Sequence, residues 1–334
     1  MNPLLEVNSL TTFLKSKKDK KHSIIEDVSF TIDKGEIIGL VGESGCGKSM
    51  TALSILKLLP KNIEVSKNSS VKLLGKEISD LSHRELRKIR GNDISMIFQE
   101  PMTSLNPVMK IGRQIREIIQ LHKKMDKNEA TELGIKLLRN VGIPSPEEAF
   151  NSFPHELSGG MRQRVMITIA MACNPKLLIA DEPTTALDVT IQAQILRLMR
   201  DLIEDFNTSI LMITHDLGVV AEMCDRIIIM YAGKIVETAD VETLFENPQH
   251  PYTKGLIASL PAASKNKKRL SSIPGNVPTI KKRPRGCRFA PRCPFAMDIC
   301  LEKDPEIFAL DDNHTSACWL HSPDHVEGVK SAND

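Results

Sequence analysis

At 334 residues the chain is longer than a single hydrophobic core usually supports, so we expect one large domain followed by a smaller appended one. Its 41% hydrophobic and 26% charged residues are typical of a globular protein, and a net charge of only +2 argues against a strongly charged partner such as nucleic acid. The N-terminal stretch MNPLLEVNSL lacks the features of a secretory signal, and no apolar run is long enough to span a bilayer. We therefore expect a cytosolic protein whose thiols stay reduced.

Lysine and arginine gather in three short runs, at residues 15–22, 265–269 and 281–285. We interpret these runs as solvated loops. The alternative is contact with an anionic membrane surface or with nucleic acid.

Continuous apolar runs mark the predicted core strands. They occupy residues 37–42 (IIGLVG), 177–181 (LLIAD) and 210–216 (ILMITHD), and an amphipathic helix is predicted over 191–206. Two further short strands are predicted around an Ala-Gly turn within 226–237. Buried strands that alternate with amphipathic helices indicate a mostly parallel α/β sheet, in which ligands bind beyond the carboxyl ends of the strands.

The first of these strands leads directly into GESGCGKS, residues 42–49, which fits the phosphate-loop pattern G-x-x-x-x-G-K-[ST]. Its glycines let backbone N–H groups converge on phosphate oxygens, and the following helix presents its N-terminus to the same anion. We expect Lys48 to reach the β- and γ-phosphates of ATP and the Ser49 hydroxyl to bind Mg²⁺. The candidate nucleotide-binding residues of this stretch are Gly42, Glu43, Ser44, Gly45, Cys46, Gly47, Lys48, Ser49 and Met50.

A second polar pair ends the strand predicted at 177–181. Asp181 is placed to hold Mg²⁺ through its water shell, because a hard cation prefers oxygen ligands. Glu182 is then placed to polarise a water for attack on the γ-phosphate. Taken alone, an Asp-Glu pair at a strand end is more often the N-cap region of a helix. Together with the phosphate loop, the pair indicates a hydrolytic site.

The stretch HELSGGMRQR, residues 155–164, places Ser-Gly-Gly before a predicted helix, yet one nucleotide does not need two anion-binding helix N-termini. The stretch resembles the signature LSGGQ of the ABC ATPases, with Met161 in its last position. The resemblance covers roughly residues 4–240. It implies a P-loop ATPase with a RecA-like α/β core, an antiparallel β subdomain and a helical arm over about residues 100–165. It also implies a set of residues that close over the γ-phosphate held by another subunit: Ser158, Gly159 and Gly160.

Further roles follow from the same resemblance, position by position. Gln99 in MIFQEP matches the glutamine that touches Mg²⁺ and the transport partner, and Asp188 in TALD matches the aspartate of the D-loop. His215 in ITHD matches the histidine that contacts the γ-phosphate and helps orient the attacking water, so the implied catalytic set is Glu182, His215 and Gln99. Phe13 is the aromatic residue best placed to stack on adenine, with a place in the core as the alternative.

The C-terminal part resembles a narrower family. NPQHPYTKGLIASLP (247–261), IPGNVP (273–278) and GCRFAPRCPFAMDIC (286–300) closely resemble the ATPase subunits of oligopeptide and dipeptide permeases. The stretch EPMTSLNP (100–107) fits the same group.

This narrower resemblance implies a domain organisation and a set of partners. It divides the chain into an ABC nucleotide-binding domain, residues 1–245, and a permease-type C-terminal extension, residues 246–334, where proline and basic residues become frequent. It implies an ATPase that energises an importer of dipeptides or oligopeptides at the cytoplasmic face of the membrane. The implied partners are two transmembrane permease subunits, an extracytoplasmic substrate-binding protein and a second, related ATPase that forms a heterodimer with this chain.

Four of the chain's seven cysteines lie in the C-terminal extension: Cys287, Cys293, Cys300 and Cys318. Four thiolates suit a structural Zn²⁺ or an iron–sulfur cluster, and these spacings are wider than those of usual zinc knuckles. The family resemblance points to a [4Fe–4S] cluster, whose charge Arg288 and Arg292 would offset. Cysteines packed in a minor core are the alternative. We expect Cys293→Ser to leave ATP binding at Lys48 largely intact, because the module is predicted to lie outside the nucleotide core.

Two other functions stay open at this stage. The cargo could be nickel, glutathione or another small solute, because related ATPases serve those permeases. An ABC ATPase acting on nucleic acid or ribosomes fits less well, since such translation factors usually carry two cassettes in one chain. DNA-repair relatives usually insert long segments between phosphate loop and signature, whereas residues 50–157 leave room only for a helical arm.

Overall fold

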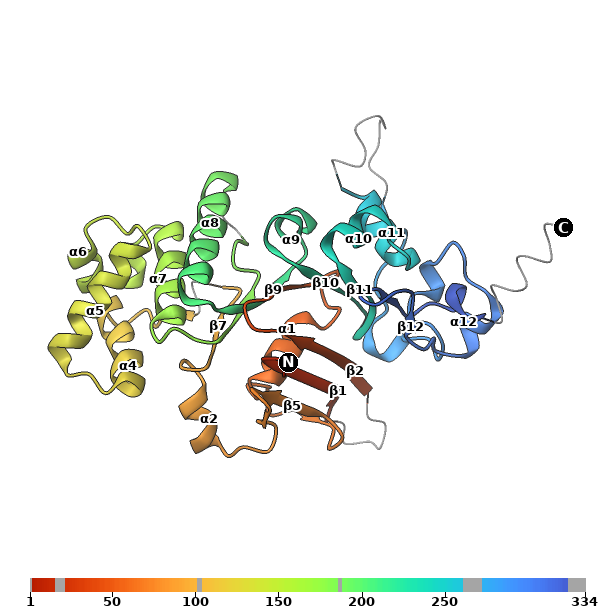
Figure 1. Ribbon diagram of the computed structural model, residues 1–334, viewed down its shortest axis with the longest axis horizontal. Coiled ribbons are helices and arrows are strands. Elements are labelled where there is room, and N and C mark those ends of the chain that lie inside the picture. The colour runs from red at the N-terminus through yellow and green to blue at the C-terminus, as the bar shows by residue number, and fades with distance from the viewer. Residues whose placement is uncertain (1, 16–21, 101–103, 186–187, 261–271, 324–334) are drawn as a thin grey trace. The chain divides into compact units, whose positions relative to one another are not determined.

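The computed structural model describes residues 2–15, 22–100, 104–185, 188–260 and 272–323 (Figure 1). The chain forms two compact units, each assembled from separate stretches. The first unit takes residues 1–6, 31–37 and 72–213, and the second takes residues 7–30, 38–71 and 214–334. Within the described residues, no helix is both long and apolar enough to cross a membrane.

The sheet of the first unit contains three parallel strands: β7 (Ile94–Ile97), β8 (Leu177–Asp181) and β9 (Ser209–Thr214). Every residue of β8 and β9 is buried, as expected for strands covered on both faces. In register, Leu177 of β8 pairs with Ile94 of β7 and with Ser209 of β9. The strands predicted at 177–181 and 210–216 are confirmed, and their polar carboxyl ends lie at one edge of the sheet.

The helices of the first unit are α2 (His83–Ile89), α4 (Ile111–Lys123), α5 (Lys127–Asn140), α6 (Pro146–Asn151), η1 (Pro154–Glu156), α7 (Gly159–Met171) and α8 (Val189–Phe206). The helix predicted over 191–206 is therefore confirmed as α8. A short hairpin pairs Lys72 of β5 (Ser70–Leu73) with Glu77 of β6 (Lys76–Glu77).

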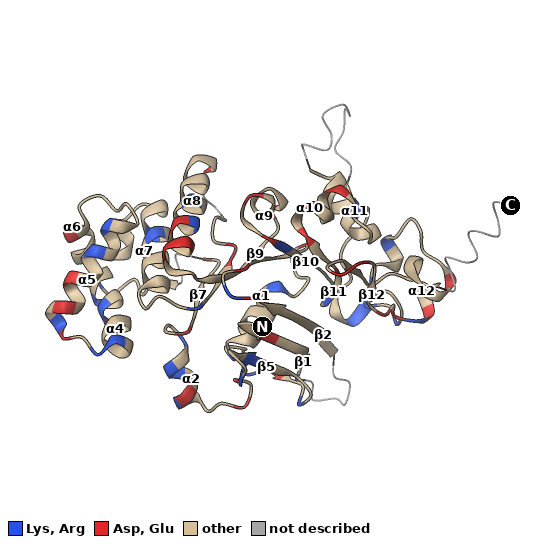
Figure 2. Ribbon diagram, viewed as in Figure 1, with Lys and Arg blue, Asp and Glu red and all other residues tan. Residues whose placement is uncertain are grey.

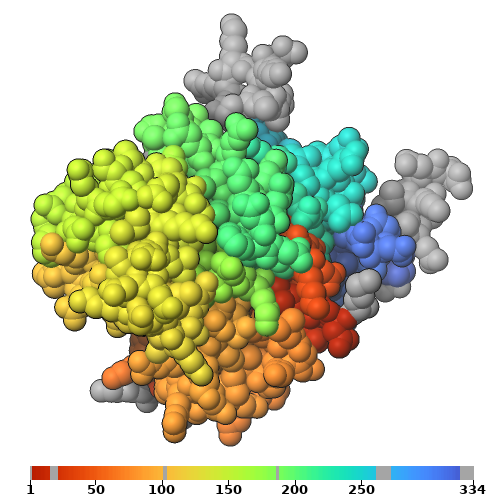
Figure 3. Space-filling view, turned by 60° about the vertical axis from the view of Figure 1, so that its left-hand side comes forward, coloured from red at the N-terminus to blue at the C-terminus, as the bar shows by residue number. Residues whose placement is uncertain are grey.

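Helices α4, α5 and α6 form the helical arm, and their surface is the yellow region of Figure 3. The ring of Phe150 of α6 packs directly against Gly112 of α4 and Gly134 of α5. A Cβ atom would lie 2.2 Å from this ring if added to Gly112 and 2.7 Å from it if added to Gly134, so both positions require glycine. Charged residues of both signs occur along α4 and α5 (Figure 2), whereas none of the buried residues of these two helices is charged.

Two groups of strands build the second unit. The first group contains β1 (Leu5–Leu14), β2 (His22–Ile32) and β4 (Ile63–Val65), and the second contains β3 (Ile37–Val41), β10 (Arg226–Tyr231) and β11 (Lys234–Asp240). Strand β10 runs parallel to β3 and antiparallel to β11, with Ala232 and Gly233 in the turn between them. The strand predicted at 37–42 and the two strands predicted within 226–237 are confirmed.

Residues after β11 add to the same sheet. Their elements are α10 (Val241–Glu246), α11 (Pro251–Ala258), η3 (Ile280–Lys282), η4 (Ala290–Arg292), α12 (Asp298–Glu302), β12 (Phe308–Ala309), β13 (Thr315–Ser316) and η5 (Trp319–His321). Strand β13 pairs antiparallel with β11, through Glu237 and Ser316, and β12 pairs with β13. The sheet is therefore mixed rather than mostly parallel. The remaining helices of this unit are α1 (Lys48–Ile55) and α9 (Leu217–Met223).

One aromatic cluster joins strand β10 to the C-terminal part. The rings of Tyr231, Tyr252 and Phe289 are fully or almost fully buried, with centroid distances of 4.6 Å (Tyr231–Tyr252), 5.2 Å (Tyr231–Phe289) and 5.4 Å (Tyr252–Phe289). Truncating a buried phenylalanine to alanine typically costs about 3–5 kcal/mol of folding free energy. Phe289 therefore fixes the cysteine-bearing segment, residues 286–300, firmly on this strand.

Candidate functional site

Residues 42–47 form the turn between β3 and α1, and Lys48 and Ser49 begin the helix, as in a phosphate loop. Gly47, the N-cap of α1, has a φ of 114°, a conformation that other residues rarely adopt. A Cβ on Gly42 would lie 2.1 Å from the carbonyl oxygen of Met230, so no larger residue fits. Within this fully described loop, no side chain caps the N-terminus of α1. Its first N–H groups can therefore bind a phosphate.

Lys48 is buried, and its ammonium lies inside the loop. Its Nζ donates to the carbonyl oxygen of Gly42 at 2.7 Å and to that of Glu43 at 3.2 Å. The same nitrogen lies 3.9 Å from the Sγ of Cys46. Burial raises the pKa of the Cys46 thiol despite this cation. The loop thus holds one fixed positive charge where an anion would enter.

Glu43, the second residue of the loop, is held by residues far along the chain. Its backbone N–H donates to the hydroxyl of Tyr252 at 2.9 Å. Its carboxylate accepts two hydrogen bonds from Nη1 of Arg292, at 2.9 Å to Oε1 and 3.1 Å to Oε2. The carbonyl oxygen of Cys46 accepts from the N–H of Gly233 at 2.7 Å. Sequence reasoning missed these contacts, since no local pattern marks a pair 249 positions apart.

A hollow of about 470 Å³ opens beside the phosphate loop. It is walled by Ser44 and Gly45 on the loop side and by Leu14, Val277 and Ile280 among others. The C-terminal residues in this wall were not anticipated either.

Phe13, the candidate adenine-stacking residue, is half-buried and lies opposite Glu64 of β4. Successive side chains of a strand point to opposite faces, so Phe13 and its neighbour Leu14 project in opposite directions. Of these two residues, Leu14 is the one that lines the hollow beside the phosphate loop.

The candidate catalytic carboxylate lies in the first unit, at the end of β8. Asp181 is buried, and Glu182 follows it with a φ of 46°, unusual for a residue other than glycine. The N–H of Glu182 donates to the carbonyl oxygen of Ile213 at 2.8 Å. Its Oε2 accepts from Nε2 of Gln99 at 3.1 Å and from the hydroxyl of Thr185 at 2.8 Å. The structure thus brings Gln99 and Glu182 together and aims the carboxylate.

Two further candidates of this unit, Ser158 and Asp188, cap helices. Ser158 is the N-cap of α7, and its Oγ accepts from the N–H of Met161 at 3.3 Å. A Cβ on Gly159 would meet nothing within 4 Å, so this N-terminus is open to a ligand. Asp188 caps α8 by accepting from the N–H of Ile191 at 2.9 Å, although residues 186–187 before it lie outside the described residues.

His215, in the second unit, directly follows β9 and is exposed. Residues 101–103 of the EPMTSLNP stretch lie outside the described part of the chain.

The four C-terminal cysteines line one small cavity together with His250, Phe289 and Trp319. Burial raises the pKa of Cys287 to about 12 and that of Cys318 to about 11, and it also raises that of Cys293. The neighbouring thiols add to each of these shifts. A bound cation would favour the thiolates of Cys287, Cys293 and Cys318, whose ionisation is disfavoured in its absence. However, no group of three or more Cys, His, Asp or Glu side chains in the described residues is arranged to hold a metal ion.

The two arginines beside these cysteines do not serve them. Arg288 donates to the carbonyl oxygen of Ala232 at 2.6 Å and pairs with Glu26 on β2. Arg292 pairs with Glu43. The expectation that both arginines offset the charge of a cluster is therefore wrong, because each is already paired with a carboxylate.

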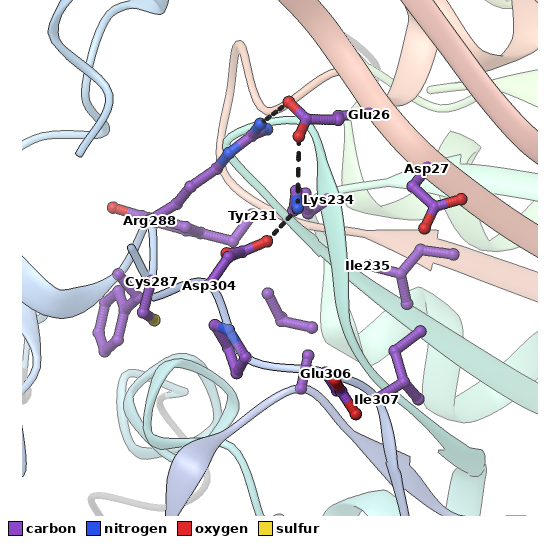
Figure 4. A pocket seen from close by; sticks show the side chains of 14 residues that line it. Glu26, Asp27, Tyr231, Lys234, Ile235, Cys287, Arg288, Asp304, Glu306 and Ile307 are labelled. Atoms are coloured by element: carbon purple, nitrogen blue, oxygen red, sulfur yellow. Dashed lines mark hydrogen bonds and ion pairs between the residues drawn. The ribbon is translucent and has the colours of Figure 1, made fainter. Parts of the chain in front are cut away.

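A charged network surrounds the contact of Arg288 (Figure 4). Glu26 also lies 3.5 Å from Nζ of Lys234, which in turn pairs with Asp304. These residues line a hollow of about 260 Å³ that also includes Cys287. All four charges are used in binding the C-terminal part to β2 and β11.

The basic run at 281–285 is not simply a solvated loop. Arg283 donates to the carbonyl oxygens of Ser23 at 2.7 Å and Ile24 at 3.0 Å, both on β2. Residues 16–21 and the run at 265–269 lie outside the described residues.

A buried carboxylate fixes the end of the chain to β11. Glu237 is fully buried, and its two oxygens accept from the backbone N–H groups of Gln249 at 2.6 Å and His250 at 2.9 Å. Oε1 also lies 2.8 Å from Nε2 of His314. Such a fully paired carboxylate is tolerated in a core, whereas removing one partner is costly.

Residues 25–185 match the family described as "ABC transporter", and residues 236–300 match the family described as "Oligopeptide/dipeptide transporter, C-terminal region". The chain is 53% identical over 98% of its length to the oligopeptide transport ATP-binding protein AppD of Bacillus subtilis, covering 99% of that protein. It is 48% identical to the oligopeptide transport ATP-binding protein OppD of Salmonella typhimurium, over 95% of this chain and 94% of that one.

Among solved structures, the chain is similar to the dimeric structure of the bacterial ABC transporter cassette MJ0796. The TM-score is 0.63 at 27% identity, over 71% of this chain and 98% of that one. A second structure of that cassette, titled as a post-hydrolysis state bound to ADP and Pi, gives the same TM-score at 26% identity.

Proposed function

We propose that this chain, which belongs to the ABC transporter family and within it to the oligopeptide/dipeptide transport ATP-binding proteins, energises the import of oligopeptides or dipeptides. It has the fold of an ABC cassette and is an ATPase of that type. The observation that carries the proposal is a C-terminal region of the oligopeptide/dipeptide type attached to a phosphate loop. The names of the relatives give the cargo class.

In the proposed reaction, the phosphate loop binds ATP. Backbone N–H groups of the loop and of the start of α1 surround the phosphates, and the Lys48 ammonium exchanges its carbonyl partners for β- and γ-phosphate oxygens. The hydroxyl of Ser49 and the carboxylate of Asp181 suit Mg²⁺, a hard cation that prefers oxygen ligands. Bound Mg²⁺ would neutralise charge that develops on the phosphates.

Hydrolysis is assigned to Glu182. Its carboxylate, held by the Gln99 amide and the Thr185 hydroxyl, polarises a water for in-line attack on the γ-phosphate. His215 would contact the γ-phosphate and help orient that water. The N-terminus of α7, with Ser158 as its cap, would close over the nucleotide of a paired ATPase, so two such chains are needed for turnover.

The proposed partners are two transmembrane permease subunits, a substrate-binding protein outside the membrane and a second ATPase. The chain would then act as a peripheral subunit at the cytoplasmic face of the membrane. Within the chain, we assign ATP binding to residues 1–245 and a permease-type extension to residues 246–334. Phe13 stays our candidate for stacking on adenine.

We further propose that the four C-terminal cysteines hold a [4Fe–4S] cluster, with Zn²⁺ as the alternative. Support comes from four free thiols, two of them buried and two half-buried, that line one cavity. A bound cluster would supply a cross-link between η4, α12 and the residue before η5. We expect the role of this cluster to be structural.

The test is reconstitution of the chain with its permease subunits and binding protein in proteoliposomes. Addition of a peptide-loaded binding protein should stimulate ATP hydrolysis and peptide uptake together, and Glu182→Gln should abolish both. Binding protein loaded with nickel or glutathione is the matched control. Stimulation by either of these instead of peptide would contradict the assigned cargo while leaving the ATPase intact.

A further inference from the structure

We propose that Arg292, which directly precedes Cys293, is a positioning residue for nucleotide binding, because its paired hydrogen bonds to Glu43 hold the phosphate loop in the shape that takes a triphosphate. The proposal rests on the function proposed above, since ATP is the ligand. It predicts, against the expectation from the sequence, that Cys293→Ser weakens ATP binding.

The guanidinium of Arg292 is fixed from several sides. Nη1 donates to both carboxylate oxygens of Glu43, while Nε donates to the carbonyl oxygen of Pro274 at 2.8 Å. The group lies 5.8 Å from the ring centroid of Tyr231 and 5.9 Å from that of Phe289, and only 6% of the side chain is exposed. A guanidinium confined in this way cannot follow a moving carboxylate, so the pair determines where Glu43 lies.

Each polar group of Glu43 is in turn engaged in shaping the loop. Its N–H is bound to the Tyr252 hydroxyl, and its carbonyl oxygen accepts from Nζ of Lys48 and from the N–H of Cys46, both at 3.2 Å. Its carboxylate also brings a negative charge into a loop that must receive a triphosphate. Arg292 offsets that charge, so loss of the guanidinium would both free the loop and leave a repulsive carboxylate beside the phosphates.

Arg292 is tied to the cysteines by the backbone of η4. Its N–H donates to the carbonyl oxygen of Phe289 at 2.9 Å, and the N–H of Cys293 donates to that of Ala290 at 3.2 Å. The N–H of Cys287 donates to the carbonyl oxygen of Cys300 at 2.8 Å. Anything that orders these cysteines therefore also orders Arg292. Because coupling is reciprocal, bound nucleotide should in turn stabilise the cysteine-bearing segment.

The experiment measures the Kd of Mg·ATP for the full-length chain by titration calorimetry, with the thermal unfolding midpoint of every variant recorded beside it. Arg292→Gln should raise the Kd about tenfold, within the range of couplings known for residues in direct contact. Arg292→Lys keeps the charge but not the paired hydrogen bonds, so its Kd should lie between those of Arg292→Gln and wild type. Arg285→Gln, which removes an exposed arginine seven positions away, is the control and should bind as wild type does.

A double-mutant cycle separates positioning from general loss of stability. In a Glu43→Gln background, Arg292→Gln should change the Kd by less than about twofold, because the partner carboxylate is gone. The same tenfold loss in both backgrounds, or an unchanged Kd for a folded Arg292→Gln chain, overturns the proposal. Should Arg292→Gln fail to fold, Arg292→Lys is put through the same cycle.

The link to the cysteines has its own measurement. Cys293→Ser should weaken ATP binding, and adding Arg292→Gln should weaken it no further, since both act through Glu43. If the fold increase in Kd of the double variant equals the product of the fold increases of the two single variants, the two residues act separately and this link is overturned. A wild-type chain that binds no ATP at all contradicts the proposed function instead, whereas a wild-type chain that binds ATP with Arg292 and Glu43 uncoupled contradicts only the present inference.

Discussion

Nε2 of Gln99 lies 3.1 Å from Oε2 of Glu182, although 83 positions separate the two residues in the chain. The amide donates to the carboxylate, and the Thr185 hydroxyl donates to the same oxygen at 2.8 Å. Two donors that converge on one oxygen fix the orientation of the carboxylate. The glutamine at the end of β7 and the carboxylate at the end of β8 are therefore linked as one unit.

Glu182→Gln should keep ATP bound and slow hydrolysis by about 10²–10⁴-fold, the usual contribution of a general base. An amide cannot take the proton of the attacking water, so the variant should accumulate as an ATP-bound closed dimer. Phosphate release under single-turnover conditions measures the first effect, and size-exclusion chromatography with ATP measures the second. The matched control is Glu204→Gln, an exposed acid on α8. Equal turnover in wild type and Glu182→Gln would remove this residue from the catalytic role.

The parts of the site that could be predicted are those that lie in short contiguous sequence motifs. The phosphate loop is eight consecutive residues, and Asp181 and Glu182 end an apolar run that is typical of a buried strand. The partner of Arg292 could not be predicted from the sequence. An arginine beside cysteines is equally compatible with two partners, a negatively charged metal cluster nearby or a carboxylate far away in the chain. Composition likewise marked residues 246–334 as a separate module, but it could not reveal that β13 extends the sheet of β11.

Gly160→Asp should block hydrolysis at the nucleotide of the facing chain and not at its own. The new carboxylate would lie at the N-terminus of α7, where it would repel the γ-phosphate that this end is proposed to contact. Dimers in which one chain carries Lys48→Ala have a single competent nucleotide site. Placing Gly160→Asp on the Lys48→Ala chain should abolish turnover, while placing it on the ATP-binding chain should spare it.

Gly160→Ala is the steric control for that experiment. Its Cβ would lie 3.2 Å from Cγ2 of Ile191, a tight contact that the aspartate shares. The alanine variant should therefore lose much less activity than the aspartate. Equal inhibition from either chain of the dimer would show that Gly160 does not face a partner's nucleotide.

Glu26→Gln should loosen the C-terminal part from β2 and lower the free energy of unfolding by about 1–3 kcal/mol, the cost of leaving a buried charged donor without its partner. Arg288, the donor concerned, has a side chain only 9% exposed. Asp27→Asn, on the wall of the same hollow, is the matched control. Urea unfolding monitored through the single tryptophan, Trp319, measures the difference. A midpoint unchanged from wild type would mean that this pair contributes nothing.

The same carboxylate predicts how stability depends on pH. Burial tends to raise the pKa of Glu26, but the Ser23 hydroxyl, Arg288 and Lys234 outweigh it and hold the pKa below its ordinary 4.5. Because the folded pKa is lowered, its contribution is present above about pH 4.5 and is lost as the pH falls through the folded value. Wild type should therefore lose more stability than Glu26→Gln between pH 5 and about pH 3. Parallel losses in the two proteins would exclude Glu26 as the source.

The cysteine cavity should bind iron. Protein purified without oxygen should be brown and contain about four iron and four acid-labile sulfide per chain, as one cubane cluster requires. Cys293→Ser should bleach the colour, whereas Cys173→Ser, which removes a half-buried thiol of the first unit, should not. Because Arg292 connects this cavity to Glu43, bleaching should also weaken ATP binding, and restoring the cluster in the wild-type chain should restore both. One zinc per chain without sulfide, under strict anaerobic handling, would replace the cluster by a zinc site. Four freely titrating thiols without any metal would show that these cysteines only pack.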